Sequence, residues 1–377
     1  MTVFPRTRRS APTWSAHTYV RQSSRRPAPI SQQARLTRPP SRPWKIRPLS
    51  NWSPKQKAAG LHVITDGEFR RGWWHLDCMW GFAGVEKVSM DKGYFFHDEE
   101  TRAESARLTG KIAFDQNHPF IEHFKFIKQF EDDTVISRQT VPAPAQLYAE
   151  LFRPENIASV HEFYGDTQKD YDELADDTAK AFHGLIMALY EAGCRNVQLD
   201  DCTWGMFCDP NFNQHYTADE FAAMQEQYAA MNNAAIEDLP EDLVITTHDC
   251  RGNYHSTWAS AGGYATVADV LFGKENVAAY YLEFDDDRSG DFEPLAKVSG
   301  DKKVVLGLIT SKKPELEDPE VIKARIAEAA QYVPLDRLCL STQCGFASTE
   351  EGNKLTEEQQ WAKIALVQSV AKDVWGE

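Results

Sequence analysis

The chain has 377 residues, of which 42% are hydrophobic, a composition that suits one large globular domain with a sizeable core. No run of about 18 or more apolar residues occurs, so we expect neither a transmembrane helix nor a membrane partner. The formal net charge of −15 repels phosphate backbones and argues against a nucleic-acid partner. The seven cysteines follow no disulfide framework and no apolar signal segment opens the chain, which indicates free thiols in a reducing, cytoplasmic environment.

The first 65 residues differ from the rest of the chain in charge, because they carry 13 Lys and Arg residues and no acidic residue. We expect residues 1–50 to form a disordered extension, since the stretch "RRPAPISQQARLTRPPSRP" has too many prolines to build regular structure. The Arg-rich, Ser-rich and acid-free composition also matches an organelle transit peptide. An organellar location is therefore the alternative to the cytoplasm.

From about residue 60, short β-rich runs that end on polar residues alternate with helical stretches. The β-rich runs are 61–68, 134–144, 194–201, 243–250, 277–287, 302–313 and 337–345. Apolar spacing near 3.6 residues predicts helices over 167–192, 217–237, 257–272, 318–331 and 356–374. Capping boxes at Thr217 with Glu220 and at Thr356 with Gln359 mark two helix starts, and Gly193 marks a helix end. The alternation indicates a parallel sheet covered by helices on both faces.

The fold class that this alternation predicts is α/β, an eight-stranded (β/α)8 TIM barrel over residues 51–377. Only seven strands are visible, because nothing before residue 61 has the pattern of a buried strand. We therefore expect an incomplete or atypical first strand. The segment from about 80 to 130 is rich in Phe and charge, and we expect it to be an insertion after the first visible strand rather than a separate domain.

The run "VITTHDC" ends on His248 and Cys250, two of the best zinc ligands, one residue apart. Side chains two apart on a strand share a face, and the functional groups of α/β barrels gather at the carboxyl ends of the strands. Glu283 and Cys344 end two further strands, so they can reach the same place. One imidazole, two thiolates and one carboxylate form a ligand set suited to tetrahedral zinc.

A simpler interpretation competes with the metal site, because a single cysteine is more often a small buried hydrophobe than a ligand. A glutamate after a strand is usually solvated. We keep the buried-hydrophobe interpretation for the remaining cysteines, which are Cys78, Cys194, Cys202, Cys208 and Cys339. For the four strand-end residues, the shared position favours the metal site.

Six stretches carry a resemblance to a known family: "VITDGEFRRGWWHLD", "VQLDDCTWG", "THDCRGN", "YYLEFDDDRSGDFEPL", "LGLITSKKPELED" and "STQCGFAS". Through them, the chain from about residue 60 to its C-terminus resembles the catalytic barrel of cobalamin-independent methionine synthase, especially its short single-barrel relatives. The resemblance implies that the four strand-end residues bind zinc and that homocysteine is the substrate. It also implies that Glu68 in "DGE" and Asp200 in "LDD" lie near the substrate ammonium group. Strand-end acids that cap a loop or a helix are the alternative.

The chain departs from the pattern of this family in three places. The second, N-terminal barrel of the full-length enzymes is not part of this sequence, and no Gly-Ser-Phe step occurs before residue 60. Lys312 stands near the position where the family has a histidine that assists protonation of the methyl donor. We expect Lys312 to act as a weak acid or a point charge for that donor, which is a methyltetrahydrofolate or a methylcorrinoid. A solvated loop lysine is the alternative.

The leading hypothesis for the function is a zinc-dependent S-methyltransferase of methionine biosynthesis, which makes methionine from homocysteine. A thiolate-rich zinc centre keeps a substrate sulfur electron-rich and activates water poorly, which favours alkyl transfer over hydrolysis. One alternative is a thiol alkyltransferase of the same superfamily that uses another thiol, and a second is a non-catalytic zinc-binding relative. Glu68 and Asp200 favour an amino-acid thiol, because a sulfonate-bearing thiol would require cations.

Overall fold

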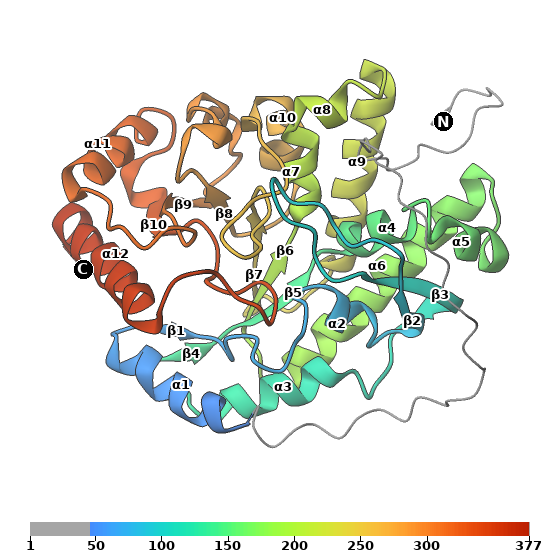
Figure 1. Ribbon diagram of the computed structural model, residues 1–377, viewed down its shortest axis with the longest axis horizontal. Helices are drawn as coiled ribbons and strands as arrows, with labels where there is room; N and C mark the ends of the chain where they lie inside the picture. Colours follow the sequence, from blue (N-terminus) through green and yellow to red (C-terminus); the bar gives the residue numbers. More distant parts are fainter. Residues whose placement is uncertain (1–45, 377) are drawn as a thin grey trace, which may run out of the picture.

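A parallel β-sheet lies at the centre of the computed structural model, which describes residues 46–376 (Figure 1). The parallel strands are β1 (Val63–Ile64), β4 (Ile136–Ser137), β5 (Gln139–Pro142), β6 (Asn196–Asp200), β7 (Val244–Asp249), β8 (Ala279–Glu283), β9 (Lys303–Ile309) and β10 (Leu338–Thr342). Six of them pair in the order β10-β9-β8-β7-β6-β5, and β1 pairs with β4, which only Arg138 separates from β5. Each β-rich run of the sequence contains at least one of these strands, so the predicted strands and the α/β class are confirmed.

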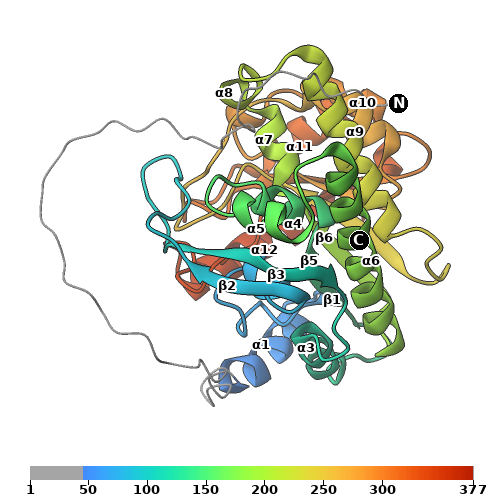
Figure 2. The same cartoon turned by 90° about the vertical axis from the view of Figure 1, so that its right-hand side faces the viewer.

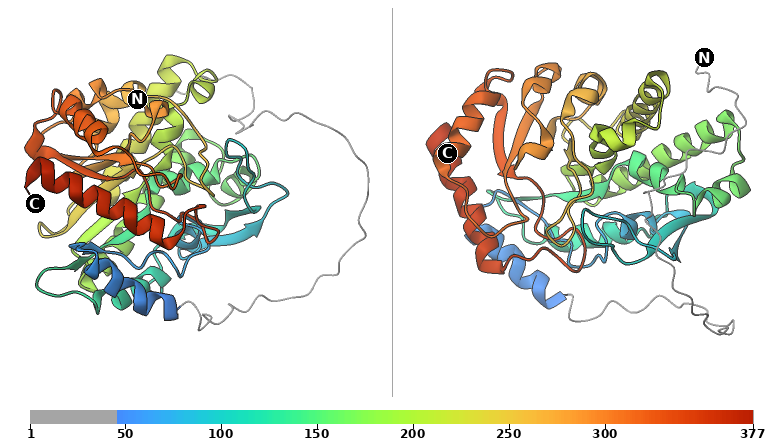
Figure 3. Two further views of the ribbon diagram at one scale, coloured as in Figure 1. Left: turned by 60° about the vertical axis from the view of Figure 1, so that its left-hand side comes forward. Right: turned by 45° about the horizontal axis from the view of Figure 1, so that its top comes forward.

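Helices connect successive strands and cover the outer side of the sheet (Figures 1 and 3). The α-helices are α1 (Ile46–Ala58), α2 (Leu76–Met79), α3 (Pro119–Lys128), α4 (Pro144–Leu151), α5 (Ile157–Phe163), α6 (Gln168–Glu191), α7 (Cys202–Cys208), α8 (Pro210–Asn213), α9 (Ala218–Ala235), α10 (Ala268–Lys274), α11 (Pro319–Ala329) and α12 (Glu357–Trp375). The 3-10 helices are η2 (Tyr264–Thr266), η3 (Asp287–Ser289), η4 (Glu293–Lys297) and η5 (Leu335–Arg337). None of the helices within residues 46–376 combines the length and the apolar character needed to cross a bilayer.

Four of the five predicted helices are confirmed as α6, α9, α11 and α12. The capping boxes that start α9 and α12 are both present, and Gly193 has a φ of +96° just after α6, as a helix-ending glycine requires. The predicted helix over 257–272 is wrong in its first half, since η2 begins only at Tyr264. Gly262 has a φ of +137°, a conformation that no α-helix accommodates, so the chain before it forms a loop.

Strands β8, β9 and β10 approach one another closely at Gly307, within the buried run "KVVLGLI" of β9. A Cβ atom at Gly307 would lie 2.5 Å from the carbonyl oxygen of Leu282 and 2.6 Å from the Cα atom of Gln343. Real Cβ atoms do not occur at such distances, so this spacing requires a glycine. Leu282 and Gln343 directly precede Glu283 and Cys344, two of the residues predicted to bind zinc.

The described residues contain no strand between β1 and β10, so residues 46–376 do not close the eight-stranded barrel that we expected. The helices next to these two strands, α1 and α12, contact each other (Figure 3). The rings of Trp52 and Trp361 lie 5.1 Å apart, and Lys55 pairs with Glu357 at 2.5 Å. Helix α1 therefore belongs to the folded body, and the domain boundary that we expected at residue 50 falls inside it. Residues 1–45 of the expected extension lie outside the described residues.

The segment expected as an insertion, from about 80 to 130, contains an antiparallel hairpin of β2 (Ala83–Ser89) and β3 (Glu104–Ala113), followed by α3 (Figure 2). The hairpin loop extends to the loop that follows β7. His97 stacks on Trp258 with ring centroids 4.5 Å apart, and its backbone N–H donates to the Trp258 carbonyl. Glu99 pairs with His255 at 2.7 Å. The hairpin loop is thus tied to the carboxyl side of the sheet.

We predict that a chain beginning at Ile46 keeps this fold, whereas a chain beginning at Leu61 is destabilised by about 3 kcal/mol or more. The shorter chain loses the packing of Trp52 on Trp361 and the hydrogen bonds between Gln56 and the backbone of the segment that follows β1. Thermal unfolding followed by circular dichroism measures the difference. Equal unfolding midpoints for the two chains would contradict the role of α1.

Candidate metal centre

His248, Cys250 and Cys344 meet at the carboxyl ends of the parallel strands. β7 carries His248 and ends at Asp249, so Cys250 follows on the same side of the strand. Cys344 lies just after the end of β10. The ligand atoms of the three residues all lie within 4.8 Å of one another, and His248 Nε2 is 3.2 Å from Cys344 Sγ. The structure thus brings three of the four predicted ligands together.

A hydrogen bond between neighbouring strands fixes the ring of His248. Its Nδ1–H donates to the carbonyl oxygen of Tyr281 in β8 at 3.1 Å, because a carbonyl oxygen can only accept. Nε2 therefore faces Cys344 and is the ring atom available to a metal ion. Metal-binding histidines are usually held by such a bond from the second ring nitrogen. With two thiols beside this imidazole, the residues fit a soft divalent ion such as zinc.

The cluster also stabilises a thiolate. Hydrogen bonds from Cys202, Cys344 and His248 hold the pKa of Cys250 well below its ordinary value, although burial opposes them. Burial lowers the pKa of His248, but the hydrogen bond and the charge of Cys250 raise it to about 9. These contacts favour the thiolate form of Cys250, which is the form that binds a metal cation.

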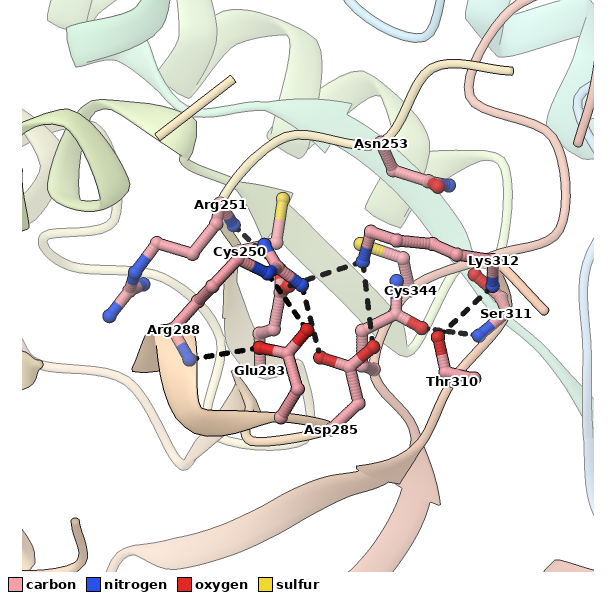
Figure 4. A network of polar contacts seen from close by, with 12 residues as sticks. Cys250, Arg251, Asn253, Glu283, Asp285, Arg288, Thr310, Ser311, Lys312 and Cys344 are labelled. Carbon is pink, nitrogen blue, oxygen red and sulfur yellow. Dashed lines mark hydrogen bonds and ion pairs between the residues drawn. The ribbon is translucent and has the colours of Figure 1, made fainter. Parts of the chain in front are cut away.

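Glu283, the fourth predicted ligand, is fully buried and lies outside the three-residue cluster (Figure 4). Its Oε2 accepts the backbone N–H of Arg251 at 2.7 Å. Its Oε1 lies 3.1 Å from the ammonium of Lys312 and 3.0 Å from the guanidinium of Arg288. Asp285 joins the same network, at 3.7 Å from Lys312 and 3.6 Å from Arg288. The carboxylate of Glu283 thus balances the buried Lys312 and the partly buried Arg288.

Lys312 lies in this ion-pair network, and its side chain is only 4% exposed, so the solvated-lysine alternative is wrong. Burial lowers the pKa of Lys312, but Glu283 and Asp285 more than offset that effect, and the pKa stays above its usual value. Lys312 does not line the cavity that holds the metal cluster. The structure therefore puts this cation beside the carboxylates behind the cluster and not in the space open to a methyl donor.

Glu68 and Asp200, predicted to bind the substrate ammonium group, both line the cavity. Glu68 has a left-handed backbone with a φ of +57°, and its Oε1 accepts hydrogen bonds from Arg71 at 2.9 Å and from Thr140 at 2.7 Å. Asp200 ends β6 and accepts a hydrogen bond from Gln198 at 2.8 Å.

Burial raises the pKa of Glu68 to about 7, a rise that Arg71 opposes and Asp200 reinforces. Burial also raises the pKa of Asp200. Such a pair of carboxylates attracts a cation.

The cavity that joins these groups has a volume of about 2190 Å³. It is lined by His248, Cys250 and Cys344, by both carboxylates, and by aromatic side chains, among them Trp73 between β1 and α2, Tyr94 of the insertion and Tyr254 of the loop after β7. A typical pocket for one small ligand has about 300–1,000 Å³. The cavity can therefore hold an amino acid together with a larger second molecule.

Sequence reasoning missed the place of Cys202. Its Sγ lies 3.4 Å from Cys250 Sγ, and its side chain lines the cavity. The buried-hydrophobe interpretation holds for Cys78, Cys194 and Cys208, whereas Cys202 and Cys339 are only partly buried. A signal was present in the sequence, because Cys202 directly follows the polar end of β6, at the same edge of the sheet as the predicted ligands.

The sequence of this chain is similar to a known protein family and to two known proteins. Residues 157–372 match the family model described as the catalytic domain of cobalamin-independent synthase. Two uncharacterized proteins of Bacillus subtilis (strain 168), YxjG and YxjH, are each 45% identical to this chain. Both alignments cover 85% of this chain and 83% of the relative.

Two solved structures extend the comparison. A Listeria monocytogenes protein with the provisional name vitamin-B12 independent methionine synthase is 38% identical, with a TM-score of 0.67, over 88% of this chain and 87% of that chain. A B12-independent methionine synthase from Shewanella sp. W3-18-1, solved in complex with selenomethionine, shares the fold at 20% identity, with a TM-score of 0.64 and the same coverage. The resemblance seen in the sequence is thereby confirmed, and the chain belongs to the family of cobalamin-independent synthase catalytic domains.

Proposed function

We propose that this chain is a zinc-dependent S-methyltransferase that transfers a methyl group to the thiol of homocysteine and forms methionine. The observation that carries the proposal is one shared cavity, lined by a cluster of one histidine and two cysteines and by the carboxylates of the buried Asp200 and the partly buried Glu68. The cluster suits a substrate thiol, and the two carboxylates suit the ammonium group of an amino acid. Homocysteine contains both groups. The provisional name of the Listeria relative points in the same direction.

His248, Cys250 and Cys344 would hold the zinc ion. Zinc bound to thiolates keeps a substrate sulfur deprotonated and electron-rich at neutral pH, which favours attack on a methyl group. Cys250 is prepared for this role, because its pKa is already low. The Tyr281 carbonyl keeps the imidazole of His248 in the orientation that a metal needs. Glu283, expected as a ligand from the sequence, acts in the structure as the counter-charge of two cations.

Glu68 and Asp200 would bind the ammonium group of the amino acid. Arg71 and Thr140 fix the carboxylate of Glu68 by hydrogen bonds, and Gln198 fixes that of Asp200. An ammonium group brings three donors and a positive charge, which relieves the repulsion between the two carboxylates. A sulfonate-bearing thiol would meet the same charges as a repulsion. This pair therefore favours an amino-acid thiol over the coenzyme thiol of another alkyltransferase.

Lys312 and His75, the two groups weighed as acids for the methyl donor, lead us to propose an activated methyl donor over a methyltetrahydrofolate. A folate nitrogen leaves readily only when it is protonated as the methyl group departs, which requires a positioned acid. Lys312 is paired with Glu283 outside the cavity. His75 lines the cavity, but burial lowers its pKa to about 3, so it is neutral. A methylcorrinoid needs no such proton.

We predict that the purified protein binds one zinc ion per chain and that Cys250→Ser and Cys344→Ser each lose most of it. The reason is that a hydroxyl replaces a thiolate in a cluster of three ligands. Metal content after dialysis is the measurement. Cys208→Ser is the matched control, since Cys208 is buried but does not line the cavity. Full zinc occupancy in both cluster variants would exclude this site.

We predict that methionine binds to the zinc-loaded protein about tenfold more tightly at pH 8 than at pH 6, because Glu68, with a pKa of about 7, must be ionised to hold the ammonium group. Methionine is the probe because it has no thiol proton of its own. Titration calorimetry measures the affinity. Glu68→Gln should remove most of the pH dependence, and Asp200→Asn should shift its midpoint to lower pH while zinc is retained. Binding that is independent of pH in the unaltered protein would refute the role of Glu68.

We predict faster turnover of homocysteine with a methylcorrinoid than with methyltetrahydrofolate at equal zinc and thiol concentrations. The physical reason is that neither Lys312 nor His75 can protonate a folate nitrogen at neutral pH. Methionine formation with each donor, measured side by side, is the test. Efficient turnover with the folate would show that another group supplies the proton.

A further inference from the structure

Arg138 is a cation that lines the cavity, and within residues 46–376 it forms no ion pair with a carboxylate. It lies between β4 and β5. Its guanidinium donates three hydrogen bonds to neutral acceptors: Nε to Oδ1 of Asn196 at 2.7 Å, Nη1 to Oε1 of Gln198 at 2.8 Å, and Nη2 to the hydroxyl oxygen of Tyr281 at 2.7 Å. Arg138 therefore serves to orient neighbouring polar groups and not to balance a carboxylate.

Two of these acceptors lie on one face of β6, together with a residue of the proposed ammonium site. Asn196, Gln198 and Asp200 alternate along the strand with buried apolar residues, and side chains two apart share a face. Nε2 of Gln198 donates to Oδ1 of Asp200 at 2.8 Å. The hydrogen bonds thus run without a break from the guanidinium of Arg138 through the amide of Gln198 to the carboxylate of Asp200.

The side-chain amide of Gln198 has only one orientation that suits both of its neighbours. A guanidinium has donors and no acceptor, so the atom of Gln198 that faces Arg138 has to be Oε1. An ionised carboxylate only accepts, so Nε2 has to face Asp200. If the amide turned over, both hydrogen bonds would be lost and Oε1 would repel the carboxylate. Arg138 therefore selects the side of the amide that Asp200 meets.

We propose that Arg138 is a positioning residue of the ammonium site, which acts through Gln198 to hold the carboxylate of Asp200 in the orientation that binds the substrate. The inference rests on the proposed function, because that function assigns Asp200 to the ammonium group. Gln198 engages Oδ1 of Asp200, whereas Oδ2 accepts no hydrogen bond within residues 46–376. Oδ2 is thus the oxygen that can accept from an ammonium group.

The shape of the guanidinium suits this task. Its three nitrogen atoms donate in one plane to acceptors on β6 and β8, which fixes the side chain at two strands. Its central carbon lies 4.8 Å from the centre of the Tyr281 ring, so the ring packs against the cation as well. The backbone carbonyl of Tyr281 accepts the hydrogen bond that orients His248. Arg138 therefore contacts a residue of each half of the site.

Three ligands separate positioning from direct contact with the substrate: methionine, decarboxylated methionine and deaminated methionine. In the zinc-loaded full chain, Arg138→Met should weaken the binding of the two ligands that carry an ammonium group about tenfold, because a charged hydrogen bond loses its fixed geometry. Binding of deaminated methionine should not change. Titration calorimetry measures the three affinities. A loss confined to the two ligands that carry a carboxylate would show direct contact with Arg138 and overturn the proposal, as would an equal effect on all three ligands or none.

Two further variants make the test specific. Gln198→Leu should reproduce the effect of Arg138→Met, and the double variant should lose no more than Gln198→Leu alone, because both changes interrupt one path of contacts. Additive losses would contradict the path. Arg153→Met is the matched control, since Arg153 also lines the cavity but lies 3.7 Å from the carboxylate of Glu150. It should leave the ratio of the three affinities unchanged, and the same change of ratio there would reduce the role of Arg138 to charge in the cavity.

A measurement without ligand separates a failure of this inference from a failure of the proposed function. The side-chain amide protons of Gln198, followed by NMR in isotope-labelled protein, should exchange with solvent about tenfold faster in Arg138→Met, because the amide is no longer held at both ends. Arg138→Gln, whose side chain carries no guanidinium, repeats the test if the methionine variant does not fold. Unchanged exchange would overturn the inference. Faster exchange in a protein that binds methionine no better than deaminated methionine would refute the ammonium site and leave the link between Arg138 and Gln198 standing.

Discussion

Asp200, His248 and Tyr281 stand level with one another because the parallel ladder between β6, β7 and β8 fixes their register. The ladder turns His248 toward the cavity and gives its ring the Tyr281 carbonyl as a partner. A slip of one residue in this pairing would exchange the two faces of the strand. Cys250 would then leave the site together with His248. The metal centre depends on this register, and buried apolar residues of the same strand, such as Ile245, hold it in place.

The chain is acidic overall, yet several cations surround the site, because each of them balances the charge of a carboxylate. Buried carboxylates require partners, and each comes from a different part of the fold. Arg71 follows β1 and pairs with Glu68, whereas Arg288 and Lys312 follow β8 and β9 and pair with Glu283. These cations are committed to carboxylates and form no ion pair with the thiols of the cluster. The proposed metal site and the proposed ammonium site therefore lie in the same cavity but rest on different groups.

Much of this arrangement was predictable, because strand ends of a parallel α/β fold converge on one edge of the sheet. The alternation of side chains along β7 is enough to put His248 and Cys250 on one face. The cationic partners of Glu283 were not predictable. They lie in loops, and no local sequence pattern predicts the path of a loop. Cys202 was missed because a single cysteine at a helix start has no spacing partner in the sequence. The prediction of a helix over 257–272 was wrong in its first half, because apolar periodicity gives no information on the backbone angle of Gly262.

Gly307 contributes no functional group, yet the dimensions of the metal centre rest on it. It lets β9 pass close to Leu282 and Gln343, the residues directly before Glu283 and Cys344. A methyl group at Gly307 would push those neighbours outward by more than the roughly 0.2 Å within which metal–ligand distances are held. The spacing of Glu283 and Cys344 therefore depends in part on a residue without a ligand atom. A substitution that loosens the packing of β9 at this point would therefore also move the backbone that carries the candidate metal centre.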